Sequence, residues 1–186
     1  MSNIACLLFD LDGTLFDSTE ANIASYAAAF ESVGLPFDEA LYRQSFGLRF
    51  DDMCDKLAPA ATDEQRSQIQ AQKTLAYKAN LGLVRANTGL LSLLESARPR
   101  YKTALVTTAR RENALNLLAY FRIHTGNFDC IIAGEDVSVS KPDPTCYLTA
   151  MERLGLSPEA CCIFEDSDVG IQAAELSGAY VIKVAI

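Results

Sequence analysis

The chain has 186 residues, of which 49% are hydrophobic, and it carries a formal net charge of -8. This length suits one full core, or a core domain with a smaller inserted one, and the apolar fraction is ordinary for a globular protein. The acidic balance without a basic stripe argues against nucleic acid and anionic membrane surfaces as partners, and no apolar run reaches the roughly 20 residues that span a bilayer.

The N-terminus and the cysteines indicate the compartment. No basic segment followed by an apolar stretch and a cleavage site is visible, so we expect a cytoplasmic protein. The six cysteines show no paired C-x-x-C spacing, which disfavours zinc sites and disulfides. We therefore expect them to be small, buried hydrophobic side chains.

The first predicted strand ends in two carboxylates. An apolar stretch within residues 4–15 delivers Asp10 and Asp12 immediately before Gly13 and Thr14. Alternate strand residues share a face, so both carboxylates are expected past the sheet edge, where a hard divalent cation such as Mg²⁺ would relieve their repulsion. Gly13 lets the backbone turn beside an anion, and Thr14 offers a hydroxyl and an amide. An ordinary Asp-rich turn is the alternative.

The segment that follows is predicted to be helical, with no convincing strand. Its first helix has an N-cap at Ser18 or Thr19. The apolar stripe of that helix consists of Ile23, Tyr26, Ala27 and Phe30. A long polar helix over residues 62–80 closes the segment.

This break in pattern predicts two domains. A helical domain over residues 17–82 is inserted into a core domain made of residues 1–16 and 83–186. The two crossings, near Phe16 and residues 81–83, are expected to act as hinges. The sequence shows no internal repeat and leaves the oligomeric state open.

From residue 83 onward, strands and helices alternate. The predicted strands cover residues 103–106, 130–133, 161–164 and 180–184, and the predicted helices cover residues 89–97, 114–121, 145–154 and 169–176. Such alternation predicts a mostly parallel sheet covered by helices on both faces, which is the doubly wound α/β class.

Polar residues follow three of the later predicted strands. Thr107 stands at the end of the second strand, and Lys141 lies in a loop stiffened by two prolines. Glu165 and Asp166 follow the fourth strand. Taken separately, each has an ordinary explanation, as a structural threonine, a solvated lysine and carboxylates that cap the next helix.

Together these motifs resemble those of the haloacid dehalogenase superfamily. The matching runs are Asp10-Leu11-Asp12-Gly13-Thr14-Leu15, Thr107, Lys141-Pro142-Asp143-Pro144 and Glu165-Asp166-Ser167. The helical insert is similar to the C1 cap of the phosphoglycolate phosphatase and β-phosphoglucomutase group. The resemblance implies a sheet order of 5-4-1-2-3, in which the ends of the first and fourth strands lie side by side at the topological switch point.

The resemblance also implies a magnesium-dependent phosphatase acting on a small phosphorylated metabolite. Asp10 is then the nucleophile that becomes an aspartyl phosphate, and Asp12 is the general acid and base. Mg²⁺ would be held by the Asp10 carboxylate, the Asp12 backbone carbonyl and Asp166, with Glu165 bound directly or through water.

Other residues are expected to bind substrate. The amides after Asp10, including those of Gly13 and Thr14, and the Thr107 hydroxyl would hold phosphate oxygens, while Lys141 balances negative charge. Thr108 stands where many relatives have asparagine, at a position expected to contact phosphate or substrate.

Arg49 is the candidate in the cap for a substrate contact, and a solvated surface arginine is the open alternative. Two other functions are also weighed. A phosphomutase of the β-phosphoglucomutase type is disfavoured because that branch carries a cap histidine at the position of Asn22, whereas His124 is the sole histidine here and lies outside the cap. A non-catalytic binding module is disfavoured because all four charged motifs are present.

Overall fold

A parallel sheet forms the centre of the computed structural model, which describes residues 4–186. Its strand order is β5-β4-β1-β6-β7. The strands are β1 (Cys6–Phe9), β4 (Lys102–Val106), β5 (Cys130–Ile132), β6 (Cys161–Glu165) and β7 (Tyr180–Lys183). All neighbouring pairs are parallel, so the predicted class and strand order are confirmed.

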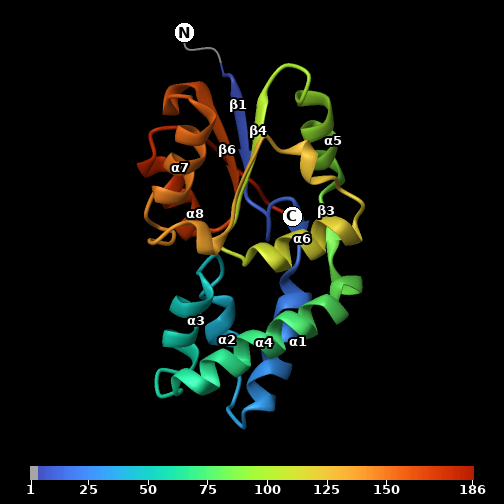
Figure 1. The fold of residues 1–186 in the computed structure, drawn as a ribbon, viewed down its shortest axis with the longest axis vertical. Coiled ribbons are helices and arrows are strands. Elements are labelled where there is room, and N and C mark those ends of the chain that lie inside the picture. The colour runs from blue at the N-terminus through green and yellow to red at the C-terminus, as the bar shows by residue number, and fades with distance from the viewer. Residues whose placement is uncertain (1–3) are drawn as a thin grey trace.

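Helices cover both faces of the sheet (Figure 1). They are α5 (Thr88–Ala97) and α6 (Arg111–Tyr120) on one side, and α7 (Thr145–Leu154) and α8 (Asp168–Leu176) on the other. Strand β1 is buried along its whole length: Leu7 and Phe9 belong to one apolar cluster, whereas Cys6 and Leu8 belong to the other. A strand between two such layers needs apolar residues on both faces, which explains its continuous apolar run.

Four helices lie beyond the end of the sheet at which β1 finishes (Figure 1). They are α1 (Thr19–Ser32), α2 (Glu39–Arg43), α3 (Phe50–Leu57) and α4 (Asp63–Ala79). These helices share a separate apolar cluster that includes Phe30, Tyr42 and Ile69. In α1 the fully buried alanines are Ala21 and Ala29, whereas the predicted Ala27 is only partly buried. The proposed domain boundaries remain a prediction.

The chain crosses between the two groups of helices through a short antiparallel ladder. Strand β2 (Phe16–Asp17) pairs with β3 (Arg85–Ala86), beside the 3-10 turn η1 (Leu81–Leu83). The ladder brings the two predicted hinges side by side. Other 3-10 turns are η2 (Thr125–Asn127), η3 (Gly134–Asp136) and η4 (Pro158–Ala160).

The cysteines and the apolar character of the helices were also considered in the sequence. The six cysteines are free and buried, as expected for small hydrophobic side chains. Among the helices of residues 4–186, none combines the length and apolar character needed to cross a bilayer.

Candidate active site

Carboxylates from distant parts of the chain converge at the ends of β1 and β6. Asp10 directly follows β1, and its amide donates to the Phe164 carbonyl at 3.0 Å. Glu165 ends β6, and Asp166 comes next. Because β1 and β6 are neighbours, one oxygen of each of the three carboxylates lies within 4.8 Å of the others. This oxygen-only donor set fits a hard divalent cation such as Mg²⁺.

Burial makes this concentration of negative charge costly. Burial and the nearby Glu165 raise the pKa of Asp10 well above its usual range, although Lys141 opposes the shift. Burial, followed by Glu165, also raises the pKa of Asp166 to about 6. The carboxylates thus lack enough positive charge within the protein, and a bound cation would supply it.

Lys141 lies under this cluster. Its Nζ is 2.7 Å from Asp10 Oδ1 and 2.9 Å from Glu165 Oε2, and the residue is 2% exposed. Burial alone would lower the pKa of Lys141, but Asp10 and Glu165 hold it above its usual value. The lysine is therefore a buried ion-pair partner and not a solvated loop residue.

Tyr147 completes this network, and the sequence analysis missed it. Its hydroxyl donates to Glu165 Oε2 at 2.6 Å, and its ring lies 5.0 Å from the Lys141 Nζ. The hydroxyl of Ser167 donates to the other oxygen, Glu165 Oε1, at 2.7 Å. Burial alone would raise the pKa of Glu165, but Lys141 and these hydroxyls bring it below its usual value. The signal in the sequence was a tyrosine on the buried face of a helix.

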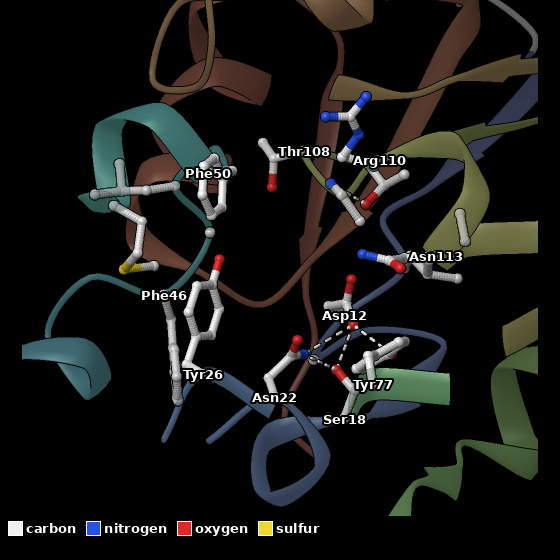
Figure 2. Close-up of a pocket in the computed structure, with 18 of the residues that line it drawn as sticks. Asp12, Ser18, Asn22, Tyr26, Phe46, Phe50, Tyr77, Thr108, Arg110 and Asn113 are labelled. Atoms are coloured by element: carbon white, nitrogen blue, oxygen red, sulfur yellow. Dashed lines mark hydrogen bonds between the residues drawn. The ribbon is translucent and has the colours of Figure 1, made fainter. Parts of the chain in front are cut away.

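Asp12 faces the helices beyond the sheet (Figure 2). Its Oδ1 accepts hydrogen bonds from the Ser18 hydroxyl, from Asn22 Nδ2 at 3.4 Å and from the Tyr77 hydroxyl at 3.4 Å. Ser18 is the N-cap residue of α1, yet its side chain bonds Asp12 in place of capping the helix. All three donors lie on Oδ1, so Oδ2 is left for other contacts.

The turn after Asp12 fixes Asp166. Gly13 has a φ of +91°, and an added Cβ would lie 2.0 Å from Asp166 Oδ2, so both backbone and space require glycine. The Thr14 hydroxyl donates to Asp166 Oδ1 at 3.0 Å, and Thr14 is fully buried. The Gly13 amide donates to the Phe16 carbonyl at 2.7 Å. The Thr14 hydroxyl and the Gly13 amide are thus engaged within the protein.

A cavity opens above these carboxylates, between the sheet and the helices α1 to α4. Its lining includes Asp10, Asp12 and Asp166 together with Thr107, Thr108, Arg110 and Asn113 on the core side, and Tyr26, Tyr42, Phe46, Phe50 and Lys73 on the opposite side. Thr107 and Thr108 thus stand where the sequence analysis expected substrate contacts. The Thr107 hydroxyl also accepts a bond from the Ala109 amide at 3.0 Å.

Arg49, which was expected to contact substrate, contacts other parts of the protein. It is not among the described residues that line this cavity. Its Nη1 donates to the Val137 carbonyl at 3.3 Å, and its Nε is 3.9 Å from Asp51. The side chain bridges the start of α3 and a core loop, and its neighbours Leu48 and Phe50 line the cavity, so the substrate contact of Arg49 stays a prediction.

Lys73 is a further cavity residue that the sequence analysis missed. It is 8% exposed, and its Nζ lies 5.3 Å from the Tyr26 ring centroid and 4.4 Å from that of Tyr77. Burial lowers its pKa to about 8. The signal was its place in the helical stripe Ile69, Lys73 and Tyr77, all of which are buried.

Comparisons with known proteins agree on one protein family. Residues 7–184 match the family described as Haloacid dehalogenase-like hydrolase. The chain is 30% identical to the phosphorylated carbohydrates phosphatase of Thermotoga maritima, over 92% of this chain and 81% of that protein. It is 29% identical to the fructose-1-phosphate phosphatase of Escherichia coli, over 97% and 96%. Among solved structures, CbbY from Rhodobacter sphaeroides in complex with xylulose-(1,5)bisphosphate has a TM-score of 0.89 at 25% identity, with 98% of this chain and 87% of that chain covered.

Proposed function

Because the chain belongs to the haloacid dehalogenase-like hydrolase family, we propose that it is a magnesium-dependent phosphatase that cleaves small phosphorylated metabolites through an aspartyl phosphate. The observation that carries this proposal is the convergence of Asp10, Glu165 and Asp166 beside the buried ammonium of Lys141. This arrangement supports the assignment of a nucleophile, a cation site and a fixed positive charge to the ends of two neighbouring strands.

The cation site is formed by oxygens. The carboxylates of Asp10 and Asp166 and the backbone carbonyl of Asp12 would hold Mg²⁺. Glu165 Oε2 accepts bonds from Lys141 and Tyr147, and Oε1 accepts a bond from Ser167, which favours contact with the ion through water over direct ligation. When bound, Mg²⁺ neutralises negative charge on the transferring phosphoryl group.

Asp10 acts as the nucleophile. One of its oxygens attacks the phosphorus, so that a bond from Asp10 to phosphorus forms while the bond to the leaving oxygen breaks. The ammonium of Lys141, 2.7 Å from Asp10 Oδ1, favours the ionised carboxylate that this attack requires. Water then attacks the aspartyl phosphate, which releases inorganic phosphate and restores Asp10.

Asp12 acts as the general acid and base. Its Oδ1 is held by Ser18, Asn22 and Tyr77, so Oδ2 is the atom that would give a proton to the leaving oxygen and later take one from the attacking water. The three donors belong to α1, its N-cap and α4. The helical segment therefore sets the orientation of the general acid and base.

The phosphoryl oxygens need donors that the turn and the core provide. The Thr107 hydroxyl lines the cavity, and the amides of Leu11 and Asp12 are the backbone donors we assign, because the Gly13 amide already bonds Phe16. Such donors stabilise the charge of the transition state in a site with little water. Thr108 lines the same wall and would contact the phosphate or the leaving group.

The leaving group would occupy the space between the core and the helices. Aromatic residues, including Tyr26, Phe46 and Phe50, form one wall, and polar residues form the other (Figure 2). This combination suits a small polar metabolite with apolar C–H surfaces, and the similarity to carbohydrate phosphatases supports a phosphorylated sugar or related ester. Asn22 stands where the mutase branch carries a histidine, and its amide donates to Asp12, so we prefer hydrolysis to the mutase alternative.

The proposal is tested by phosphate release from p-nitrophenyl phosphate and a panel of sugar phosphates, with Mg²⁺ or with excess chelator. We expect turnover to need Mg²⁺ and to fall at least about 10³-fold in Asp10→Asn, since the amide is a poor nucleophile. Asp17→Asn, at a nearby half-buried position outside the cavity lining, serves as the matched control. Turnover without Mg²⁺, or in Asp10→Asn, would contradict the mechanism.

The same assay separates the alternatives. A sugar phosphate isomer that accumulates faster than free phosphate would indicate a mutase. Saturable binding of a phosphorylated ligand with no phosphate release would indicate a binding module.

A further inference from the structure

Asn113 carries a buried amide that the protein leaves partly unpaired. It lies in the first turn of α6 and is 4% exposed. Within residues 4–186, its Oδ1 has no hydrogen-bond partner. A buried acceptor without a donor destabilises the folded state. Because the fold offers this oxygen no donor, the stability of the fold does not explain why an asparagine stands here.

The position of the amide points to a ligand. Asn113 lines the cavity, and Figure 2 shows its nitrogen pointing into the cavity on the side of Asp12. The side chains that hold Asp12 are already engaged, since Ser18, Asn22 and Tyr77 all donate to its Oδ1. Asn113 differs from them, because its amide keeps hydrogen-bonding capacity toward the space that the leaving group would fill.

The residues around Asn113 indicate which chemical group of the ligand it would bind. The cations Arg110 and Lys73 line the same cavity as Asp10 and Asp12, so an anionic group of the ligand would be drawn to those cations, whereas the neutral amide of Asn113 suits a neutral hydroxyl. An amide and a hydroxyl also match each other, because each can both donate and accept. The aromatic side chains on the opposite wall would contact the C–H groups of the same molecule.

We propose that Asn113 is a specificity-determining residue that hydrogen-bonds a hydroxyl of the leaving group, close to the ester oxygen that Asp12 protonates. This inference rests on the proposed phosphatase function. The enzyme then favours phosphate esters of polyols over equal esters that lack this hydroxyl, because the latter leave a buried amide unpaired.

Matched esters test the proposal. The pair 2-hydroxyethyl phosphate and ethyl phosphate differs by one hydroxyl, as does the pair glucose 1-phosphate and 2-deoxyglucose 1-phosphate. We expect wild-type kcat/KM to be about tenfold or more higher for the hydroxylated member, which corresponds to about 1.4 kcal/mol. In Asn113→Leu this preference should fall to near unity, with the loss confined to the hydroxylated ester. Phosphoglycolate, which has a carboxylate in place of the hydroxyl, should gain nothing from Asn113.

Thermal unfolding separates this role from a structural one. Removing an unpaired buried polar atom should leave Tm unchanged or raise it in Asn113→Leu, although kcat/KM falls. Asn116→Leu is the matched control, because it makes the same change on the same helix outside the cavity lining, and the ester preference should persist there. If leucine prevents folding, Asn113→Ala makes the same test without added bulk.

The outcomes distinguish the two proposals. A wild type that releases phosphate but shows no preference within either pair overturns the role of Asn113 alone. An equal loss for both esters in Asn113→Leu, or a lower Tm with an unchanged preference, also overturns it. A wild type that hydrolyses neither ester nor p-nitrophenyl phosphate overturns the phosphatase function itself.

Discussion

Lys141 and Lys73 are both buried lysines, but they have different partners. Lys141 lies within hydrogen-bond distance of two carboxylates, so its charge is compensated. Lys73 lies against two tyrosine rings, and the attraction of a cation to an aromatic face returns only part of the cost of burying its charge. Lys141 therefore helps to keep the carboxylates of the site ionised. Burial of Lys73 lowers the free energy of unfolding by an amount that depends on pH.

That difference predicts a pH effect for Lys73→Met. The pKa of Lys73 is lowered from 10.5 to about 8 in the folded state, so between these values the unfolded chain binds more protons and wild-type stability rises with pH. We expect Lys73→Met to be more stable than wild type at pH 7, by an amount on the order of 3 kcal/mol, and this advantage to shrink as pH rises from 8 to 10.5.

Urea unfolding across that pH range measures the difference in free energy of unfolding. Lys78→Met is the control, because Lys78 is an exposed lysine on the same helix. A stability difference between wild type and Lys73→Met that stays constant with pH would contradict the assignment.

At the scale of single residues, the order of the motifs predicts which carboxylates converge. It does not predict where a side chain points or which hydrogen bonds it forms. The convergence of Asp10 with Asp166 follows from the strand order that the motifs imply. By contrast, the bond from the Gly13 amide to Phe16 depends on a local turn, and the contact of Arg49 with Val137 depends on how α3 packs against a core loop. Composition and spacing carry no information about such contacts.

Among the secondary-structure elements, β6 and α7 together position the charged network. Glu165 ends β6, and Tyr147 projects from α7, so their hydrogen bond of 2.6 Å joins the helix to the strand. The predicted bounds of α7 agree with the structure, and those of β6 differ by one residue, because β6 is a continuous buried run and the buried residues of α7 recur at helical spacing. The ladder of β2 and β3 was missed because strands of two residues have no periodicity to detect.

Tyr147→Phe tests this link between α7 and β6. The ring and its packing remain, but Glu165 loses a donor, and we expect a loss of about 1–3 kcal/mol in the free energy of unfolding, as for hydrogen bonds to charged groups. Because Glu165 also positions Lys141, kcat should fall about three- to tenfold while KM stays nearly constant.

Urea unfolding and steady-state kinetics provide both readouts. Tyr180→Phe, at a tyrosine that is 54% exposed, should change neither. A rise in KM with kcat unchanged in Tyr147→Phe would instead place the hydroxyl in substrate binding.

For the whole molecule, the site lies where two separately packed groups of helices meet at the end of the sheet (Figure 1). The core supplies the proposed nucleophile and cation site, whereas α1, its N-cap and α4 supply the donors that hold Asp12. The sequence predicts this division from the break in strand and helix alternation. It does not predict which cap residues face the cavity, because that depends on how the two groups pack together.

The acidic site also links the stability of the whole protein to Mg²⁺. Asp10 lies close to Glu165 and Asp166 in the native state but far from them in the unfolded chain, so an ion held by all three would bind the folded state preferentially. At a Mg²⁺ concentration of 100 times Kd, we expect about 2.7 kcal/mol of added stability, which for a chain of this length corresponds to a rise in Tm of about 5–10 °C.

Calorimetry against Mg²⁺ concentration measures the shift. NaCl at equal ionic strength should not reproduce it, and Asp166→Asn should remove most of it, because that variant keeps the fold but loses a ligand charge. A shift that persists in Asp166→Asn would place the stabilising ion elsewhere on this acidic protein.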